Sequence, residues 1–248
     1  MKTLRIQLNQ MFIMVLVGAF LSVTSTLQAY GHVPENLDAF ELRFSEFKCN
    51  VKDYHRNILF TAQNEECKYY FLKDGLSMRM PESTMVAKPT PSSIDSRQIN
   101  LRWEGINSSL EVVAADELKM KRNTKDCVEK QFRKLFYNQL YPGIDLMYAD
   151  KADQLELDFQ IEAGFNHSDI KFKLEGAQDI RVDALGRLLV RTNGGEIIFD
   201  KPMAQQEGKP LTATWVFDGQ WVSLQIKNAS LDRFTHVQTQ IVQKDMSL

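Results

Sequence analysis

Histidine, cysteine and glycine are scarce in this chain of 248 residues, which holds four, three and twelve of them, respectively. It has no H-E-x-x-H sequence, no pair of histidines at helical spacing, no G-x-S-x-G elbow and no glycine-rich phosphate loop. The three cysteines form no C-x-x-C pair, so their spacing matches no common zinc site. These absences predict a protein with no metal site, no cofactor and no catalytic residues.

An excess of charge of one sign is also missing. The chain has 30 Lys and Arg against 32 Asp and Glu. This balance gives no electrostatic reason to expect a nucleic acid or an acidic membrane surface as a partner. Apolar residues make up 44% of the chain, enough to predict a folded protein rather than a disordered one.

Long hydrophobic runs are absent apart from one near the N-terminus. Residues Met1–Ala29 have a positive start, an apolar middle (Met11–Leu21) and a small, polar end, the three parts of a secretory signal. The middle is shorter than the roughly 20 residues of a membrane span. We expect cleavage after Ala29 or Ser25, no lipid anchor, no transmembrane segment in the mature chain, and a secreted, periplasmic or cell-surface protein. A buried N-terminal helix and an uncleaved anchor are the alternatives.

Alternation of apolar and polar residues dominates the rest of the chain. It is clearest in Gln154–Ile161, where every second residue is apolar. Such a period of two predicts a strand with one buried and one solvated face. The buried face then holds Leu155, Leu157, Phe159 and Ile161. The solvated face holds Glu156, Asp158 and Gln160, and we expect Asp158 to be replaceable at little cost in stability.

Similar short runs, separated by Gly, Asn and Asp, predict an all-β protein of antiparallel hairpin meanders, with little helix after the signal. Asn193-Gly194-Gly195 is a strong hairpin turn, because Asn and Gly accept a positive φ cheaply. The expected organisation is one or two β-sandwich-like units: a signal peptide (1–29), an N-terminal β unit (30–120), a linker or short helix (121–137), a C-terminal β unit (138–235) and a tail (236–248). Residues 82–96, rich in Pro and Ser, are expected to form a surface loop or a flexible insertion. The further strands expected are 41–47, 57–62, 68–72, 77–80, 99–103, 110–114, 144–148, 170–174, 180–182, 187–192, 196–199, 203–206, 211–217 and 221–226.

Export would place the cysteines in an oxidising compartment, where a disulfide is plausible. Cys49 and Cys67 lie near the ends of neighbouring expected strands, which favours a bond between them and leaves Cys127 free. The alternative is three unpaired, half-buried thiols.

Several residue groups resemble parts of catalytic or binding sites. Cys67 or Cys49 with His55 as base would make a nucleophile, although a structural disulfide is the favoured interpretation. Ser45 and Lys48 match S-x-x-K only in letters, because that chemistry needs helical spacing. Three tryptophans suggest either a carbohydrate platform or, more often, a hydrophobic core (Trp103, Trp215 and Trp221). Five acids suggest either a Ca²⁺ or glycosidase site or, more often, solvated strand and turn residues (Asp145, Asp150, Asp153, Glu156 and Asp158).

Residues 140–206 carry a recognisable order of motifs. "LYPGIDLMY" (Leu140–Tyr148) is followed by "QLELDF" (Gln154–Phe159), a D-x-x-G-x-L hairpin from Asp183, and "KPMAQQ" (Lys201–Gln206). This order resembles an N-terminal module of unassigned function in secreted bacterial proteins. That module often precedes SBBP-type β-propeller repeats, or adhesion-like and sorting domains of gliding-motility-associated proteins in Bacteroidota. The first half of the chain fits the pattern more loosely.

The resemblance implies no enzymatic residue, and it implies structural roles for its motif residues: Tyr141, Pro142, Gly143, Asp145, Tyr148, Leu155, Asp158, Phe159, Gly194 and Gly195. No propeller repeat or sorting domain follows, so a stand-alone or truncated member is expected. The main hypothesis is an exported, non-catalytic β module for interaction or assembly at the bacterial cell surface, with an unknown surface protein or glycan as partner. The alternatives are a carbohydrate- or peptide-binding module and a hydrolase whose site is not visible in the sequence.

Overall fold

The computed structural model describes residues 42–49, 57–80, 97–123 and 127–244, all of which belong to one compact unit, Phe40–Leu248. The expected signal peptide, the 82–96 loop, His32 and His55 lie outside the described residues.

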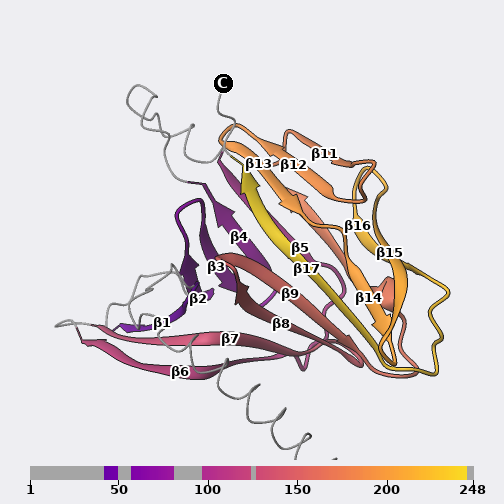
Figure 1. Ribbon diagram of the computed structural model, residues 1–248. Coiled ribbons are helices and arrows are strands. Elements are labelled where there is room, and N and C mark those ends of the chain that lie inside the picture. The colour runs from indigo at the N-terminus through magenta and orange to yellow at the C-terminus, as the bar shows by residue number, and fades with distance from the viewer. Residues whose placement is uncertain (1–41, 50–56, 81–96, 124–126, 245–248) are drawn as a thin grey trace, which may run out of the picture. The chain divides into compact units, whose positions relative to one another are not determined.

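The fold is all-β, as the alternation predicts (Figure 1). In the described part of the chain, a single sheet of 17 strands is joined by antiparallel pairings. A short 3-10 helix, η2 (His167–Asp169), interrupts it. The strands are β1 (Phe44–Cys49), β2 (Ile58–Gln63), β3 (Lys68–Leu72), β4 (Gly75–Arg79), β5 (Gln98–Trp103), β6 (Glu111–Asn123), β7 (Cys127–Tyr141), β8 (Ile144–Lys151), β9 (Gln154–Ile161), β10 (Lys171–Glu175), β11 (Asp179–Val182), β12 (Leu188–Thr192), β13 (Gly195–Phe199), β14 (Met203–Gln206), β15 (Lys209–Phe217), β16 (Val222–Lys227) and β17 (Thr235–Lys244).

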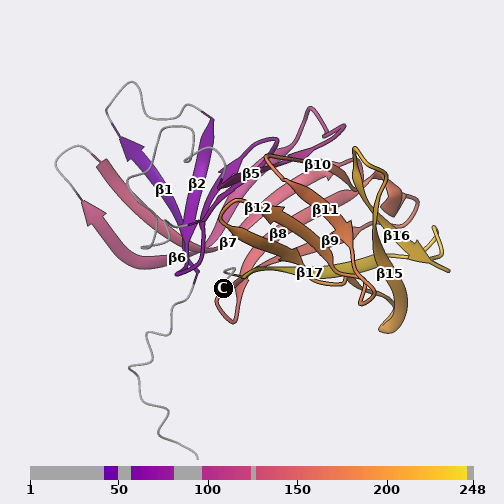
Figure 2. The same cartoon turned by 90° about the horizontal axis from the view of Figure 1, so that it is seen from above.

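The sheet closes on itself. Pairings lead from β1 through β2, β3, β4 and β5 to β10, then through β16, β15 and β14 to β17. From β17 they return through β9, β8 and β7 to β1. Strand β6 extends this circuit beside β7 (Figure 2). Strand β13, with β12 and β11, extends it beside β17 (Figure 1). Strands from both halves of the sequence therefore belong to one sheet.

Aromatic side chains fill the inside of the circuit. Trp103 of β5 meets Phe159 of β9 edge to face, with ring centroids 5.9 Å apart. Tyr148 of β8 packs the same way on Phe71 of β3, at 5.1 Å. Because β3 and β5 lie on the opposite side of the circuit from β8 and β9, these contacts hold the two sides together.

The outer face of β9 differs from the sequence prediction. Glu156 and Asp158 are 7% and 5% exposed, so they are buried rather than solvated. Strand β9 lies between β8 and β17, and long side chains of these neighbours cover it. Lys151 forms an ion pair with Glu156, and His236 Nε2 forms a hydrogen bond with Asp158 Oδ1. The alternation itself is confirmed, but the second face of this central strand is covered as well.

Two parts of the expected organisation differ from the structure. The described residues of the expected linker or short helix (121–137), namely 121–123 and 127–137, lie in the paired strands β6 and β7. Most of the expected tail is strand β17, which pairs with β9, β13 and β14. The sequences of β7 and β17 show no clear alternation of apolar and polar residues. In β7 the buried positions include 132, 135, 137 and 140, which do not follow a strict period of two. A bulge at Gln139, with φ of 56°, shifts the phase between 137 and 140.

The helical content is small, as expected. No helix among the residues that the structure describes is long and apolar enough to span a membrane.

Candidate binding surface

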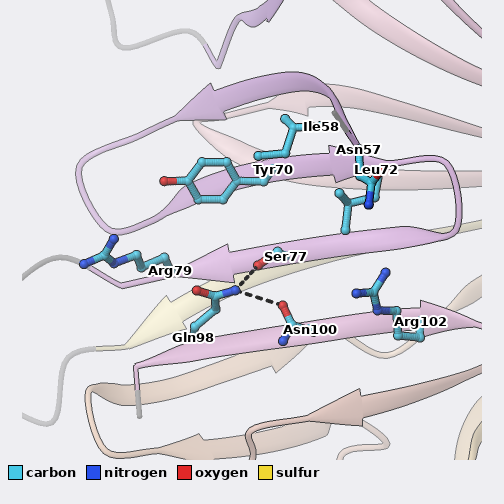
Figure 3. A pocket seen from close by; sticks show the side chains of 9 residues that line it. All are labelled: Asn57, Ile58, Tyr70, Leu72, Ser77, Arg79, Gln98, Asn100 and Arg102. Carbon is cyan, nitrogen blue, oxygen red and sulfur yellow. Dashed lines mark hydrogen bonds between the residues drawn. The ribbon is translucent and has the colours of Figure 1, made fainter. Parts of the chain in front are cut away.

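A hollow of about 430 Å³ lies on the sheet face that points away from the aromatic core, over strands β2 to β5 (Figure 3). We call this surface the β2–β5 face. Its lining residues are Asn57, Ile58, Tyr70, Leu72, Ser77, Arg79, Gln98, Asn100 and Arg102.

Strand alternation and register assemble these residues. Tyr70 of β3 pairs with Ser77 of β4, which pairs with Asn100 of β5, so the three form one row across the sheet. Arg79 and Gln98 pair in the next row. The intervening residues of the same strands point into the core, including Tyr69, Phe71, Met78, Ile99 and Leu101. The period of two thus builds an apolar inner face and a polar outer face from the same segments.

A glycine contributes to the hollow. Gly75 lies in the row between Leu72 and Arg102, where it supplies no side chain. A Cβ atom at this position would lie 2.0 Å from the carbonyl oxygen of Leu101. The close approach of β4 to β5 therefore requires glycine here.

One amide organises the middle of the face. The Nε2 of Gln98 donates to the Ser77 hydroxyl at 2.8 Å and to Oδ1 of Asn100 at 3.0 Å. These bonds hold both amides in place on rigid strands. The amide nitrogen of Asn100 has no hydrogen-bond partner among the described residues.

The Tyr70 hydroxyl and the Arg79 guanidinium lie at one end of the hollow (Figure 3). Within the described parts of the chain, neither group has a hydrogen-bonding or ionic partner, and both side chains are part-exposed. The second arginine behaves differently. Arg102 donates to both carboxylate oxygens of Asp74, at 2.9 Å each. As far as the described residues go, the face therefore offers one unpaired guanidinium beside a hydroxyl.

Positive charge extends past the hollow. The Lys68 ammonium lies 5.5 Å from the centre of the Tyr70 ring. On β10, beside β5, Lys171 and Lys173 lie 5.1 and 4.2 Å from the centre of the Trp221 ring. Glu175 of β10 lies opposite Asn100 and adds one negative charge beside the hollow. The cations Lys68, Lys171 and Lys173 outnumber it, and this excess favours a ligand with negative charge.

Of the suggested nucleophile and base, the structure describes the side chain of Cys67 alone. Cys67 is 2% exposed, and burial raises its pKa to about 12. Such a thiol stays protonated at neutral pH, and the thiolate is the reactive form. Ser45 lies in strand β1, so the helical spacing that S-x-x-K chemistry needs is absent.

The acids of β8 and β9 do not converge. Asp145 accepts the backbone N–H of Gln139 at 2.6 Å, and Asp158 accepts His236 Nε2 at 2.7 Å and Gln238 Nε2 at 3.0 Å. The other nitrogen of His236 is 3.0 Å from the Gln205 amide. In the described ranges, no three His, Cys, Asp or Glu residues gather at a point that would hold a metal ion. Asp158, His236, Gln238 and Gln205 therefore form a local hydrogen-bond network that joins β9, β17 and β14.

The tryptophans form no common platform. Trp103 and Trp215 are buried in the core, and Trp215 donates its indole N–H to the Asp200 carbonyl at 2.9 Å. Trp221 lies at the surface, where the Lys171 and Lys173 side chains cover it.

The motif residues have local structural roles. Pro142 and Gly143 form the turn between β7 and β8, where Gly143 has a φ of 68° and the Phe165 ring occupies the space of a Cβ. The Tyr141 hydroxyl donates to the Lys171 carbonyl at 2.9 Å and so ties this turn to β10. Tyr148, Leu155 and Phe159 are core residues. Asn193 and Gly194 form the turn between β12 and β13, and Gly195 is the first residue of β13.

The expected Cys49–Cys67 bond is absent, because Cys67 is a free, buried thiol. Gln63 pairs with Lys68, so Cys67 lies opposite residue 64. Ser45 pairs with Thr61, and the same register puts residue 64 opposite residue 42, just before β1. Seven residues of strand, roughly 23 Å, then separate Cys67 from Cys49. A disulfide tolerates about 7 Å between Cα atoms.

The β2–β5 face itself had no sequence signal beyond its strands. Its residues come from four strands, and their polar positions look like those of any solvated strand face. Pairing across strands, which register alone decides, is what brings Tyr70, Arg79, Gln98 and Asn100 together.

Residues 47–233 match the model of a protein family described as a domain of unknown function, DUF7948. No curated protein and no solved structure matches the chain. The match covers most of the chain, including the whole block from Tyr141 to Gln206. The protein therefore belongs to the DUF7948 family, a domain of unknown function.

Proposed function

We propose that this domain is a non-catalytic binding module of an exported bacterial protein, and that its β2–β5 face binds a carboxylate-bearing polysaccharide. One observation carries the proposal: Arg79 and Tyr70, whose guanidinium and hydroxyl have no partner among the described residues, border the same hollow as two oriented amides.

The chemistry of these groups matches an acidic sugar chain. A guanidinium binds a carboxylate through two parallel hydrogen bonds. Amide and phenol groups donate to and accept from sugar hydroxyls. Ile58 and Leu72 add apolar surface at the edge of the hollow. Binding sites usually combine such apolar lining with a few oriented polar groups, so the mixture supports binding.

Export and location at the cell surface belong to the same proposal. They rest on the signal-like pattern of Met1–Ala29 and on the resemblance to modules of secreted proteins with SBBP-type repeats. An acidic polysaccharide is a ligand that such a protein would meet outside the cell. Interaction or assembly at the bacterial surface would then proceed through this glycan.

The test is affinity electrophoresis of the purified protein in gels containing polygalacturonic acid. We expect retardation by this polymer and none by dextran, which has no carboxylate. Arg79→Ala should weaken binding about tenfold, the effect of losing roughly 1.4 kcal/mol. Tyr70→Phe should weaken it less, because only the hydroxyl is lost.

Arg233→Ala is the matched control. Arg233 is exposed, and it pairs with Glu207 near the start of β17, outside the β2–β5 face. Its replacement should leave binding unchanged. Equal weakening by both arginine variants would indicate unspecific charge attraction. Equal retardation by polyglutamate would indicate an acidic peptide as ligand instead. Shortening of the polymer during incubation would contradict the non-catalytic part of the proposal.

A further inference from the structure

Two cysteines far apart in the sequence occupy opposite positions in one antiparallel strand pair. Strand β1 pairs with β7 over six consecutive positions, from Phe44 opposite Phe132 to Cys49 opposite Cys127. The register contains no shift, so this juxtaposition follows from the whole pairing rather than from one contact.

We propose that Cys49 and Cys127 form a disulfide bond that links β1 to β7 in the exported protein. Residues directly opposite each other in antiparallel strands have Cα atoms about 4.5 or 5.5 Å apart, depending on the hydrogen-bonding position. Disulfides span about 4.4–6.8 Å between Cα atoms. Either kind of position therefore permits the bond without movement of the backbone.

The third cysteine does not compete. Cys67 lies seven strand residues from the level of Cys49, and its thiol is buried and donates to the Lys68 carbonyl at 3.7 Å. Burial also raises the pKa of this thiol to about 12, which suppresses thiol–disulfide exchange. The three cysteines thus divide into one pair at opposite backbone positions and one buried thiol.

The bond would strengthen the attachment of β1, the strand through which the circuit of pairings closes. Strand β1 pairs with β2 at a single position, Ser45 opposite Thr61, whereas six positions join it to β7. The circuit therefore closes through β1, and β1 is held mainly by β7. A covalent link at Cys49 fixes the end of that pairing.

Oxidised glutathione is a sufficient oxidant. The thiolate of one cysteine attacks the glutathione disulfide, which gives a protein–glutathione mixed disulfide and releases one glutathione thiolate. The second cysteine thiolate attacks the protein sulfur of that mixed disulfide, and the second glutathione leaves. Two electrons pass from the protein thiols to glutathione, and the two thiol protons end on the two released glutathione molecules.

Trypsin distinguishes the possible pairings directly. The full chain is incubated with oxidised glutathione, alkylated under denaturing conditions and digested without reduction. Cleavage after Lys and Arg puts the cysteines in three separate peptides: 49–52, 126–130 and 57–68. We expect peptide 49–52 joined to 126–130, and peptide 57–68 alkylated. A bond from Cys67 to either other cysteine, or three alkylated cysteines, would overturn the proposal.

A second measurement follows the effect of the bond on the fold. Reduction should lower the midpoint of thermal unfolding by roughly 10 °C, because the bond closes a long loop. Cys67→Ala should keep both the cross-linked peptide and this shift. Cys49→Ser should lose both, with the same midpoint before and after reduction. A shift that persists in Cys49→Ser would also contradict the bond. The outcome is independent of polysaccharide binding.

Discussion

Two outer faces of the same sheet carry polar side chains and use them differently. On the β2–β5 face, Arg79 and Tyr70 have no partner in the described part of the chain. On the outer face of β9 and β17, Asp158 is 5% exposed and bonded to both His236 and Gln238. The first arrangement leaves hydrogen-bonding capacity for a ligand, and the second uses that capacity within the fold. Polar residues on a strand face therefore indicate a binding site only when their head groups are free.

The largest expected effect concerns the inner face of β9. Phe159→Asp puts a charge beside Trp103 in the aromatic core, where no cation compensates it among the residues described. We expect the free energy of unfolding to fall by roughly 4 kcal/mol or more. Urea denaturation followed by tryptophan fluorescence measures this change. A loss below that of Asp158→Ser would show that the faces of β9 are assigned wrongly.

Asp158→Ser tests whether the polar residues on the outer face of β9 and β17 stabilise the fold. Removing this carboxylate leaves His236 and Gln238 without their shared acceptor, so we expect a loss of about 2 kcal/mol, measured in the same way. A double-mutant cycle with Gln238→Ala should give a coupling energy of at least 0.5 kcal/mol. A near-neutral effect of Asp158→Ser would restore the sequence prediction of a solvated acid.

The smallest expected effect belongs to the open face. Arg79→Ala and Tyr70→Phe remove groups that have no partner in the described fold, so stability should stay within about ±0.5 kcal/mol. Urea denaturation of both variants tests this expectation. A loss of 2 kcal/mol from either change would show that the β2–β5 face is structural, like the face of β9 and β17.

Local sequence predicted most strands closely. The range of β9 was predicted without error, and β3 and β14 likewise, since their short alternating runs are bounded by turn residues. Strand β17 was missed because three of its five core-facing residues are polar: Thr235, Thr239 and Gln243. Each is tolerated inside because it has a distant partner. Gln243, for example, donates to the Tyr69 hydroxyl at 2.7 Å, across 174 positions of sequence.

The candidate sites show the same limit. Neither the β2–β5 hollow nor the opposition of Cys49 and Cys127 follows from spacing along the chain, because both depend on the register between strands that are remote in sequence. The expected Cys49–Cys67 pair assumed that cysteines near the ends of neighbouring strands meet. In the structure Cys67 lies beside the start of β1, whereas Cys49 is the last residue of β1.

The amino-acid sequence by itself determined the class of the fold, the faces of its local hairpins and the family to which the chain belongs. Alternation and turn residues act within about ten residues, and they suffice for these features. Only the tertiary structure decided that both halves share one closed sheet, that Glu156 and Asp158 are buried, and that Arg79 and Tyr70 lie in one hollow. Burial and pairing depend on which strands become neighbours. The pairings of β17 with β9 and of β7 with β1 join segments distant in sequence, so local patterns do not predict them.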